Sequence, residues 1–339
     1  MQSSILPDQQ KIEFTGDAKE YFGIWISNLV LSIITLGIYS AWAKVRRETY
    51  FKNNTKISER GFGYHATGKQ IFQGRLIAVV AIILLNIMTK SEPLFAMAMG
   101  PIFIFLAPWV LNNSMQFSAR ATSYRNIRFN WHGTYWETFW FLVIAPMLGI
   151  LTLGLLTPLV SKSYYSYFAC SHSYGTTRFT CQPTIGTFYF AFLVTVIPTI
   201  LLVCVILGST AFVTSTSLVQ ITLAAFYAFI FSIIFIYPIL CRNLMVKALS
   251  LKRATLIVSF DSTISPIKFI WISLLNWVLT IISIGLLMPW AKIRMYRYLS
   301  DCTLIKMNGN VEQFIDEAKA SQSSLGEAVA DFEGIEVSI

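Results

Sequence analysis

Charged residues are scarce in this sequence. Asp, Glu, Lys and Arg together make up 13% of the 339 residues, and hydrophobic residues make up 55%, whereas an average soluble domain has roughly 25% charged residues. Six apolar runs contain no Asp, Glu, Lys or Arg, namely 76–88, 94–115, 139–160, 188–208, 214–240 and 269–290. Most approach or exceed the roughly 20 residues that cross a bilayer core. The composition therefore predicts an α-helical, polytopic integral membrane protein, and the missing buried charge argues against a proton relay.

Motifs of common enzymes and metal sites are also missing. The sequence has no Walker motif, GxSxG or HExxH, and Gly61 and Gly63 form only a GxG. The five cysteines, an odd number without CxxC or zinc spacing, are expected to be unpaired and reduced: Cys170, Cys181, Cys204, Cys241 and Cys302. The first twenty residues lack the apolar core of a signal peptide, so the amino terminus is expected to be retained. We predict no cofactor and no enzymatic activity, with a membrane enzyme that uses Tyr or His as the alternative.

An internal repeat is present in the sequence. The segment NLVLSIITLGIYSAWAKVRRETYF (28–51) recurs in register as NWVLTIISIGLLMPWAKIRMYRYL (276–299), and a degenerate copy at 150–168 keeps the glycine but has lost the Trp and most basic residues. A single repeat-built membrane domain is expected at 1–305, with copies near 14–60, 130–180 and 260–305 and helical hairpins near 70–120 and 185–250. An acidic cytoplasmic tail follows at 306–339.

Short segments of alternating apolar residues precede the apolar blocks. They lie at 11–17, 61–68, 126–133, 176–183, 256–263 and 303–309, and each is followed by polar turn residues. If these segments are homologous they belong on one side of the membrane, as one small sheet or a set of hairpins. Such an arrangement requires four full spans plus three re-entrant or short apolar segments that turn back near Gly37, Gly154 and Gly285; the alternative is seven spans.

The four-span arrangement also gives the stronger charge asymmetry. Its full spans lie near 70–89, 93–115, 185–208 and 215–240, and Lys90 is then the one basic residue outside. Because basic residues favour the cytoplasmic side, both termini are predicted to be cytoplasmic.

The same residues carry a resemblance to a known family. The signature TLGIYSAWAKVRRETYF, the segment GFGYHATG, the PW…N segment from Pro108 and the ending SLGEAVADFEGIEVSI are similar to the YjgN-like family of bacterial inner-membrane proteins, a domain of unknown function. The resemblance runs from Phe14 to the last residue. It implies a multi-pass protein of the bacterial inner membrane and brings no catalytic residues. The middle copy departs from the signature at Ser161 and Ser163.

Basic residues follow an interfacial Trp in two of the copies. The candidates for binding lipid head-group phosphates are Lys44, Arg46, Arg47, Lys292, Arg294 and Arg297. The commoner role of such residues is to set topology and anchor a helix at the interface.

Polar residues inside the apolar blocks are a second set of candidates. Asn28, Asn276, Asn113 and Asn243 are intramembrane amides that line a polar path or, more commonly, hydrogen-bond between helices. His65 and His132 occupy matching places and are weak metal or pH-sensing candidates; no acid or cysteine lies at ligand spacing, so no metal site is predicted.

Two functional hypotheses follow. The first is a passive transporter or channel-like protein for a neutral or lipidic solute. The second is a non-enzymatic membrane scaffold that binds anionic lipid or partner proteins through its basic cytoplasmic face, with no role for nucleic acid. In either case we expect the acidic tail to dock on basic groups such as Lys44, Arg47, Arg120 and Arg294.

Overall fold

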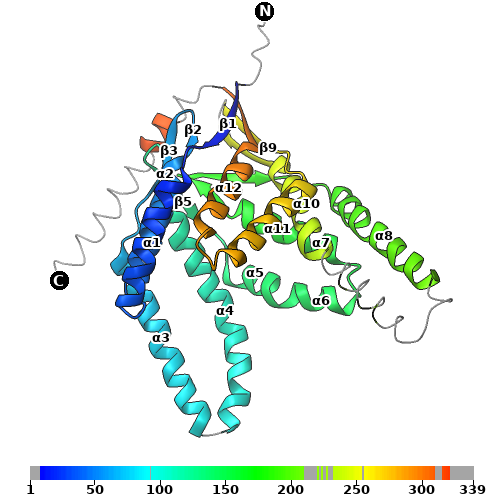
Figure 1. Ribbon diagram of the computed structural model, residues 1–339. Coiled ribbons are helices and arrows are strands. Elements are labelled where there is room, and N and C mark those ends of the chain that lie inside the picture. The colour runs from blue at the N-terminus through cyan, green and yellow to red at the C-terminus, as the bar shows by residue number, and fades with distance from the viewer. Residues whose placement is uncertain are drawn as a thin grey trace, which may run out of the picture.

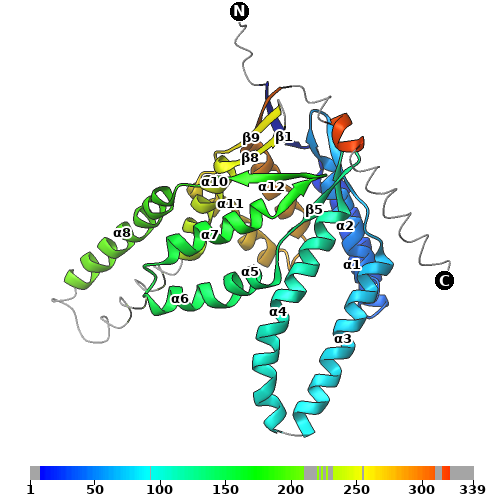
Figure 2. The same cartoon turned by 180° about the vertical axis from the view of Figure 1, so that it is seen from behind.

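Strands and helices occupy separate parts of the molecule. The computed structural model describes residues 8–91, 93–209, 220, 223, 227, 232–253, 256–309 and 315–320. The strands gather at one end, and the helices extend from them to the opposite side (Figure 1). The hairpin of α3 (Gly68–Ser91) and α4 (Pro93–Ala121) reaches furthest from the strands, as the reverse view also shows (Figure 2).

Ten strands of the described residues form one closed antiparallel ring, which we call the strand ring. They are β1 (Asp8–Phe14), β2 (Thr55–Ile57), β3 (Arg60–Tyr64), β4 (Thr122–Tyr124), β5 (Ile127–Trp131), β6 (His172–Tyr174), β7 (Thr177–Cys181), β8 (Leu249–Arg253), β9 (Leu256–Ser262) and β10 (Thr303–Asn308). Neighbours in sequence are neighbours in the ring. β1 closes it by pairing its first half with β10 and its second half with β2.

Tight turns join the strands in pairs. Ser58 and Glu59 between β2 and β3, and Arg125 and Asn126 between β4 and β5, all have positive φ. Two successive residues of this kind form the turn whose twist matches antiparallel strands. Alternate side chains of the hairpins then point inward and form the core of the ring, which includes Ile57, Ile127, Tyr174, Leu251, Val258 and Ile305.

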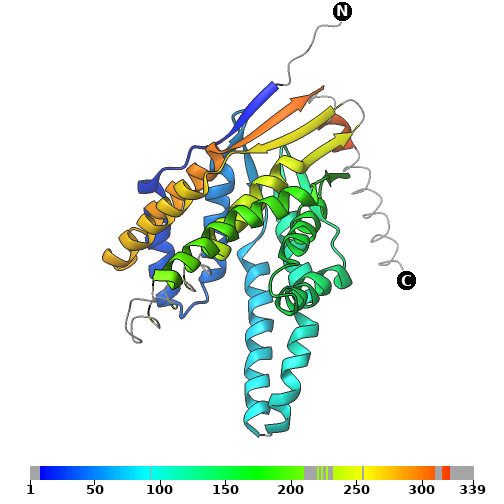
Figure 3. The same ribbon diagram turned by 90° about the vertical axis from the view of Figure 1, so that its right-hand side faces the viewer.

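Pairs of helices connect one strand hairpin with the next. The remaining helices are α1 (Ala18–Ile34), α2 (Ser40–Asn54), α5 (Tyr135–Phe139), α6 (Ala145–Leu151), α7 (Thr157–Cys170), α8 (Ile185–Ser209), α10 (Tyr237–Ala248), α11 (Pro266–Ile282) and α12 (Met288–Asp301). Single π-helical turns, Trp140–Ile144 and Ser232–Ile236, precede α6 and α10. Because both ends of a helix pair join the ring, its turn lies far from the ring (Figure 3).

Three of these turns have the same backbone. Gly37, Gly154 and Gly285 have φ of 90°, 86° and 87°, and the residue before each glycine also has positive φ. The Gly37 N–H donates to the Ser32 carbonyl at 2.7 Å, and the Gly154 and Gly285 N–H groups each donate to the carbonyl five residues earlier. Glycine adopts this conformation without steric cost. Each turn ends one helix and sends the chain back along it.

The predicted polytopic α-helical membrane fold, with four full spans plus three short segments or with seven spans, is wrong. The observed core is the closed strand ring. Within the described ranges, none of the helices combines the length and the apolarity needed to cross a bilayer. The apolar run 139–160 is divided among α5, a π-helical turn, α6 and the start of α7, and the run 269–290 is divided between α11 and α12. Most of the predicted span at 215–240 lies outside the described residues.

The short alternating segments do form strands. Each of the six overlaps one of β1, β3, β5, β7, β9 and β10. The sequence did not reveal β2, β4, β6 and β8, which directly follow helices α2, α4, α7 and α10. Strand β10 runs to Asn308, past the predicted start of the tail at residue 306.

Candidate functional site

A buried tyrosine ties the helices together at the ring end in two of the Gly-centred helix pairs, α1–α2 and α11–α12. The Tyr50 hydroxyl accepts from the Asp17 N–H at 2.8 Å and donates to the Asp17 carbonyl at 2.9 Å. The Tyr298 hydroxyl makes the same two bonds with Ser265, at 3.1 and 3.2 Å. Asp17 and Ser265 are the residues that cap α1 and α11, so each tyrosine joins the end of the second helix to the start of the first. Burial raises the pKa of Tyr50 to about 12, which keeps the hydroxyl protonated and able to donate.

Two of the candidate asparagines tie the same helix pairs in the middle. The Asn28 side-chain N–H donates to the Ala43 carbonyl at 3.5 Å, and that of Asn276 donates to the Ala291 carbonyl at 3.0 Å. Both amides are buried between the helices that they join. The structure therefore gives them the hydrogen-bonding role that polar residues in apolar helices commonly have.

The other two asparagines lie elsewhere. Asn243 donates to the Ile264 carbonyl at 2.7 Å and accepts from the Ser262 hydroxyl at 2.7 Å, so it holds α10 against the end of β9. Asn113 is exposed on α4 and lines a polar cavity of about 300 Å³. We call this the basic cavity; its lining includes His65, Gln70, Asn113, Gln116, Arg120 and Arg128.

The turns of the Gly-centred helix pairs are apolar and almost fully exposed. Leu36, Leu153 and Ile284, which precede the three glycines, are 94%, 95% and 94% exposed. We call the turns with their flanking residues the apolar tips; they also expose Ile33, Ile34, Ile38, Ile150, Leu151, Leu155, Ile281, Ile282 and Leu286. Contiguous apolar surface of this kind marks contact with another apolar phase.

The basic residues of α2 have local partners. The Arg46 guanidinium donates to the Asn28 amide oxygen at 3.3 Å and to the Tyr39 hydroxyl at 3.2 Å. Arg47 forms an ion pair with Glu48 at 2.9 Å, and Lys44 is half-buried.

The basic residues of α12 make different contacts from those of α2. Arg294 lies over the Trp290 ring at 5.2 Å, and the Arg297 guanidinium donates to the Gly16 carbonyl at 3.0 Å. Burial, followed by repulsion from Arg47, lowers the pKa of Lys292. The two predicted basic clusters therefore make different local contacts, and their binding of head groups stays a prediction.

The two candidate histidines bond to serines of the neighbouring strand. His65 Nε2 lies 2.7 Å from the Ser123 hydroxyl, and His132 Nε2 lies 3.0 Å from the Ser173 hydroxyl. Burial, followed by repulsion from positive charges, lowers the pKa of His132, which favours the neutral ring. Across the described part of the chain, no group of three His, Cys, Asp or Glu side chains is placed to hold a metal ion.

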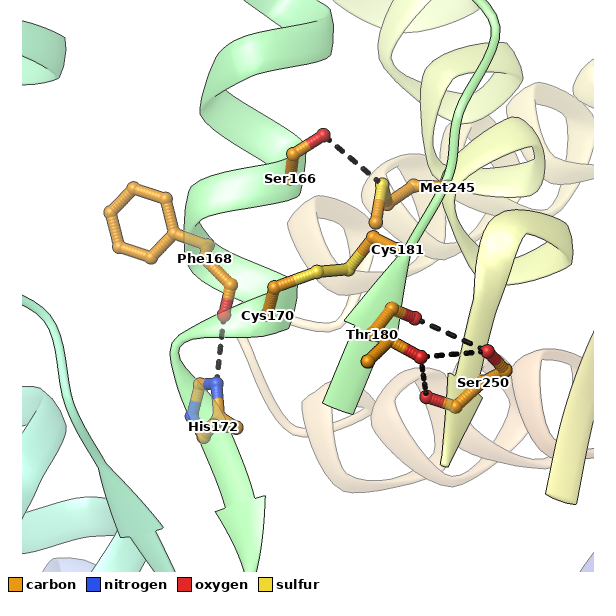
Figure 4. Close-up of a disulfide and its surroundings, with 8 residues drawn as sticks. All are labelled: Ser166, Phe168, Cys170, His172, Thr180, Cys181, Met245 and Ser250. Carbon is orange, nitrogen blue, oxygen red and sulfur yellow. Dashed lines mark hydrogen bonds between the residues drawn. A yellow bond between two sulfur atoms is a disulfide. The ribbon is translucent and has the colours of Figure 1, made fainter. Parts of the chain in front are cut away.

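A disulfide joins Cys170 at the end of α7 to Cys181 at the end of β7, as Figure 4 shows. The expectation that all five cysteines are unpaired is therefore wrong for these two. The β6–β7 hairpin brings the two Cα atoms to 6.1 Å although eleven positions separate them in sequence. Cys204, Cys241 and Cys302 are free thiols.

A larger apolar cavity of about 380 Å³ lies inside the strand ring, and we call it the ring cavity. Phe62, Phe129, Phe179 and Phe260 line it from four different strands. They occupy matching places in four of the six alternating segments, so the repeated phenylalanine was a signal that the sequence analysis missed. Gln10, Ser58 and Arg125 supply the polar part of the lining.

One short part of the acidic tail is packed on the ring. Helix 315–320 buries Ile315 and Ala318 in the core of the ring, and Glu317 lies 3.9 Å from Arg253. Arg253 was not among the predicted partners of the tail. The rest of the predicted docking segment, 321–339, lies outside the described residues.

Comparison with known proteins identifies the relatives of the chain. A family model described as "Bacterial protein of unknown function (DUF898)" matches residues 9–332. The chain is 21% identical over 366 residues to the inner membrane protein YjgN of Salmonella typhimurium, with 92% of each chain covered. It is 30% identical over 149 residues to the inner membrane protein YjgN of Escherichia coli K12, which covers 42% of this chain and 37% of that protein. No solved structure matches.

These relatives confirm the resemblance to the YjgN-like family and support an inner-membrane location. Because the family model matches nearly the whole chain, the chain belongs to the DUF898 family of bacterial proteins.

Proposed function

We propose that this protein is a non-enzymatic scaffold of the inner membrane that binds anionic phospholipid. The three apolar tips are the observation on which the proposal rests. They lie on the helices, away from the strand ring (Figures 1 and 3). Burying Leu36, Leu153 and Ile284 in lipid would contribute about 4 to 9 kcal/mol, from roughly 1.5 to 3 kcal/mol for each side chain. The matching backbone of the tips further supports an origin of the three helix pairs from one repeated unit.

Exposed apolar residues on the α3–α4 hairpin support the same orientation. Leu76, Ile77 and Val80 of α3, and Phe103 and Phe105 of α4, are among the large apolar side chains exposed on this hairpin. Figure 2 shows α3, α4 and α1 extending away from the strands, with α5 and α6 running sideways on the same helical side, so one lipid phase on that side would cover the hairpin and the tips. The strand ring would then lie outside the lipid.

The basic cavity is where we place the phospholipid head group. Arg120 and Arg128 present two guanidinium groups to a space that His65, Gln70 and Asn113 line with further hydrogen-bonding groups. Guanidinium groups bind phosphate through paired, charge-assisted hydrogen bonds. The cavity lies where α3 and α4 join the ring, which is where head groups would meet the protein.

We propose that the ring and both termini face the cytoplasm. Asp8 of β1 pairs with Met307 of β10, so the two ends of the described chain enter the ring side by side. Single cysteines at the exposed residues Thr176 and Lys252, in a background without other cysteines, test this orientation. A membrane-impermeant thiol reagent should leave both unlabelled in intact spheroplasts and label both after lysis. Labelling of either site before lysis would reject the proposal.

Lipid retention tests the scaffold. The full chain would be reconstituted in nanodiscs that contain equal amounts of phosphatidylglycerol and phosphatidylcholine, extracted gently, and analysed by native mass spectrometry. We expect preferential retention of phosphatidylglycerol, reduced several-fold by Arg120→Gln with Arg128→Gln. Lys252→Gln, which removes an exposed cation of β8, is the matched control and should retain as much as the wild type. Equal retention of the two lipids by the wild type would refute the proposal.

The passive transport of a neutral or lipidic solute is the competing hypothesis. It predicts that the protein accelerates the flux of glycerol, or the exchange of a labelled lipid between leaflets, in sealed proteoliposomes. The scaffold predicts rates equal to those of protein-free vesicles. Acceleration that scales with the amount of folded protein would replace the scaffold with a transporter.

A further inference from the structure

The ring cavity has the properties of a prepared ligand site. Its volume of about 380 Å³ falls within the range of small-molecule pockets, roughly 300 to 1,000 Å³. Protein cores are ordinarily packed with few voids larger than a water molecule. This space lies within the main hydrophobic core of the ring, so its size requires an explanation other than loose packing.

Two tyrosines hold the wall of the cavity open. The Tyr124 hydroxyl donates to the Ile57 carbonyl at 2.9 Å, and the Tyr174 hydroxyl donates to the Tyr124 carbonyl at 2.9 Å. These bonds join three successive strand hairpins and direct the polar atoms of the rings into the wall. The aromatic carbons then face the cavity beside Phe62 and Phe129, with ring centroids of Phe129 and Tyr174 5.2 Å apart.

The lining of the ring cavity is mostly apolar, and two of its polar residues lie in turns between strands. Ser58 and Arg125 occupy equivalent turns of neighbouring hairpins, and the Ser58 hydroxyl donates to the Gln10 side-chain oxygen. Arg125 is the charged residue among the described residues that line the cavity, and its guanidinium lies 5.8 Å from the centroid of the Tyr124 ring. A mostly apolar space of about 380 Å³ with one cation in its lining suits a molecule with an apolar chain and one anionic group.

We propose that the ring cavity binds a long-chain carboxylate, with the acyl chain among the four phenylalanines and the carboxylate toward Arg125. Such molecules partition into the membrane in which the relatives of this chain are found, so the ligand and the protein would share a compartment. Ile315 of helix 315–320 lines the cavity as well and would cover the chain of the ligand. This site is separate from the basic cavity and does not depend on the scaffold function.

Equilibrium binding to the full chain in nanodiscs tests the proposal. A fluorescent long-chain carboxylate would be titrated against the protein and displaced with unlabelled palmitate or with hexadecanol, which has the same chain and no charge; empty nanodiscs give the background. Arg125→Gln should raise the Kd of the carboxylate by roughly ten- to hundredfold, since a hydrogen bond to a charged group is typically worth 1.5 to 3 kcal/mol. The Kd of the alcohol should change by less than about twofold.

A second variant probes the chain end of the site. Val258→Phe adds bulk to the apolar wall and should weaken the carboxylate and the alcohol alike, and Ile305→Phe replaces it if the first variant does not fold. Arg178→Gln removes an exposed arginine of β7 and is the matched control, with binding unchanged. The proposal would be overturned if the wild-type protein binds no more carboxylate than empty nanodiscs. It would also be overturned if Val258→Phe or Ile305→Phe folds and binds the carboxylate normally. Arg120→Gln with Arg128→Gln should still bind carboxylate well above the background of empty nanodiscs, so failure of the head-group proposal is distinguishable from failure of this one.

Discussion

Removal of one hydroxyl, in Tyr50→Phe, gives the sharpest test of how the helix pairs are held on the ring. The substitution keeps the ring, which packs on Tyr21 and Phe51 at centroid distances of 5.4 and 5.8 Å. It removes the hydrogen bonds with the N–H and the carbonyl of Asp17, at 2.8 and 2.9 Å, and the longer one with the Glu20 carboxylate, at 3.2 Å. Leaving a partly buried backbone group without its partner costs about 1 to 3 kcal/mol. We therefore expect the free energy of unfolding to fall by about 1 to 3 kcal/mol.

Tyr298→Phe removes the equivalent pair of bonds at Ser265 and provides an internal comparison. Its two distances, 3.1 and 3.2 Å, are longer than those of Tyr50, so we expect a smaller loss of stability. Tyr164→Phe is the matched control because Tyr164 is 42% exposed and packs only at the surface of α7. That variant should unfold within about 0.5 kcal/mol of the wild type.

Thermal unfolding followed by circular dichroism in nanodiscs measures the differences at a fixed scan rate. The order of melting temperatures should be wild type and Tyr164→Phe, then Tyr298→Phe, then Tyr50→Phe. A Tyr50→Phe protein that melts with the wild type would refute the reasoning, because it would mean that the ring-end bonds do not hold the helix pairs in place.

Three further predictions use the same unfolding measurement. Gly154→Ala should destabilise the protein by about 1 kcal/mol because Gly154 has a positive φ. Gly23→Ala, in open space on α1, should be neutral or stabilise the protein by up to about 1 kcal/mol. The opposite order of stabilities would contradict the turn assigned at Gly154. Cys170→Ser should lower the stability of oxidised protein by about 3 kcal/mol, from the short loop that the bond to Cys181 closes, and should change nothing in protein kept reduced. Burial raises the pKa of Tyr165 to about 12 from an unfolded value of about 10. The contribution of the neutral hydroxyl to the free energy of unfolding is therefore complete below pH 10 and is lost as the pH rises toward 12. Tyr165→Phe should flatten that part of the pH–stability curve, and an unchanged slope would reject the assignment.

Local sequence signals located several elements correctly. The alternation in segments such as 126–133 lies on β5, since a period of two reports directly on a strand with one buried face. The glycine at position 285 marks the end of α11 because no side chain competes for its positive φ. The repeat further indicated that residues such as Asn28 and Asn276 have one shared role, and both do bond to the facing helix.

The prediction of the fold class was wrong because the fold depends on strand pairings between distant parts of the chain, which no local sequence pattern indicates. Ring closure requires Gln9 to pair with Lys306, nearly the whole length of the chain apart. The seven-span alternative had a second source of error: it counted an apolar block of 22 residues as one element, although the turn at Gly285 divides the block into two helices. The disulfide was missed for the same reason as the ring, since Cys170 and Cys181 meet only once β6 and β7 have paired.

The candidate site was also only partly predictable, because local sequence patterns identify residue types but do not show which distant residues the fold brings together. Basic residues were assigned to head groups by their position after a Trp. In the structure Arg46 bonds to Asn28 of its own helix pair, and Arg297 of α12 bonds to the Gly16 carbonyl just before α1. The basic cavity arises because strand pairing sets Arg128 of β5 beside α4, which carries Arg120. Similarly, each phenylalanine of the ring cavity is unremarkable in its own segment. The cavity exists because closure of the ring turns the four toward one space.

The ring also connects the two proposed sites mechanically. Each helix pair begins and ends at strands of the ring, so a change in the spacing of the strands would move the helices that carry the apolar tips. Tyr124 belongs to the wall of the ring cavity, and the next residue on the same strand, Ser123, bonds to His65 of the basic cavity. A ligand that pushes against Tyr124 therefore acts on a strand whose other contacts line the basic cavity. Because interactions between binding sites are reciprocal, carboxylate binding in the ring cavity and phospholipid binding in the basic cavity should alter each other's affinity by the same factor if they are coupled.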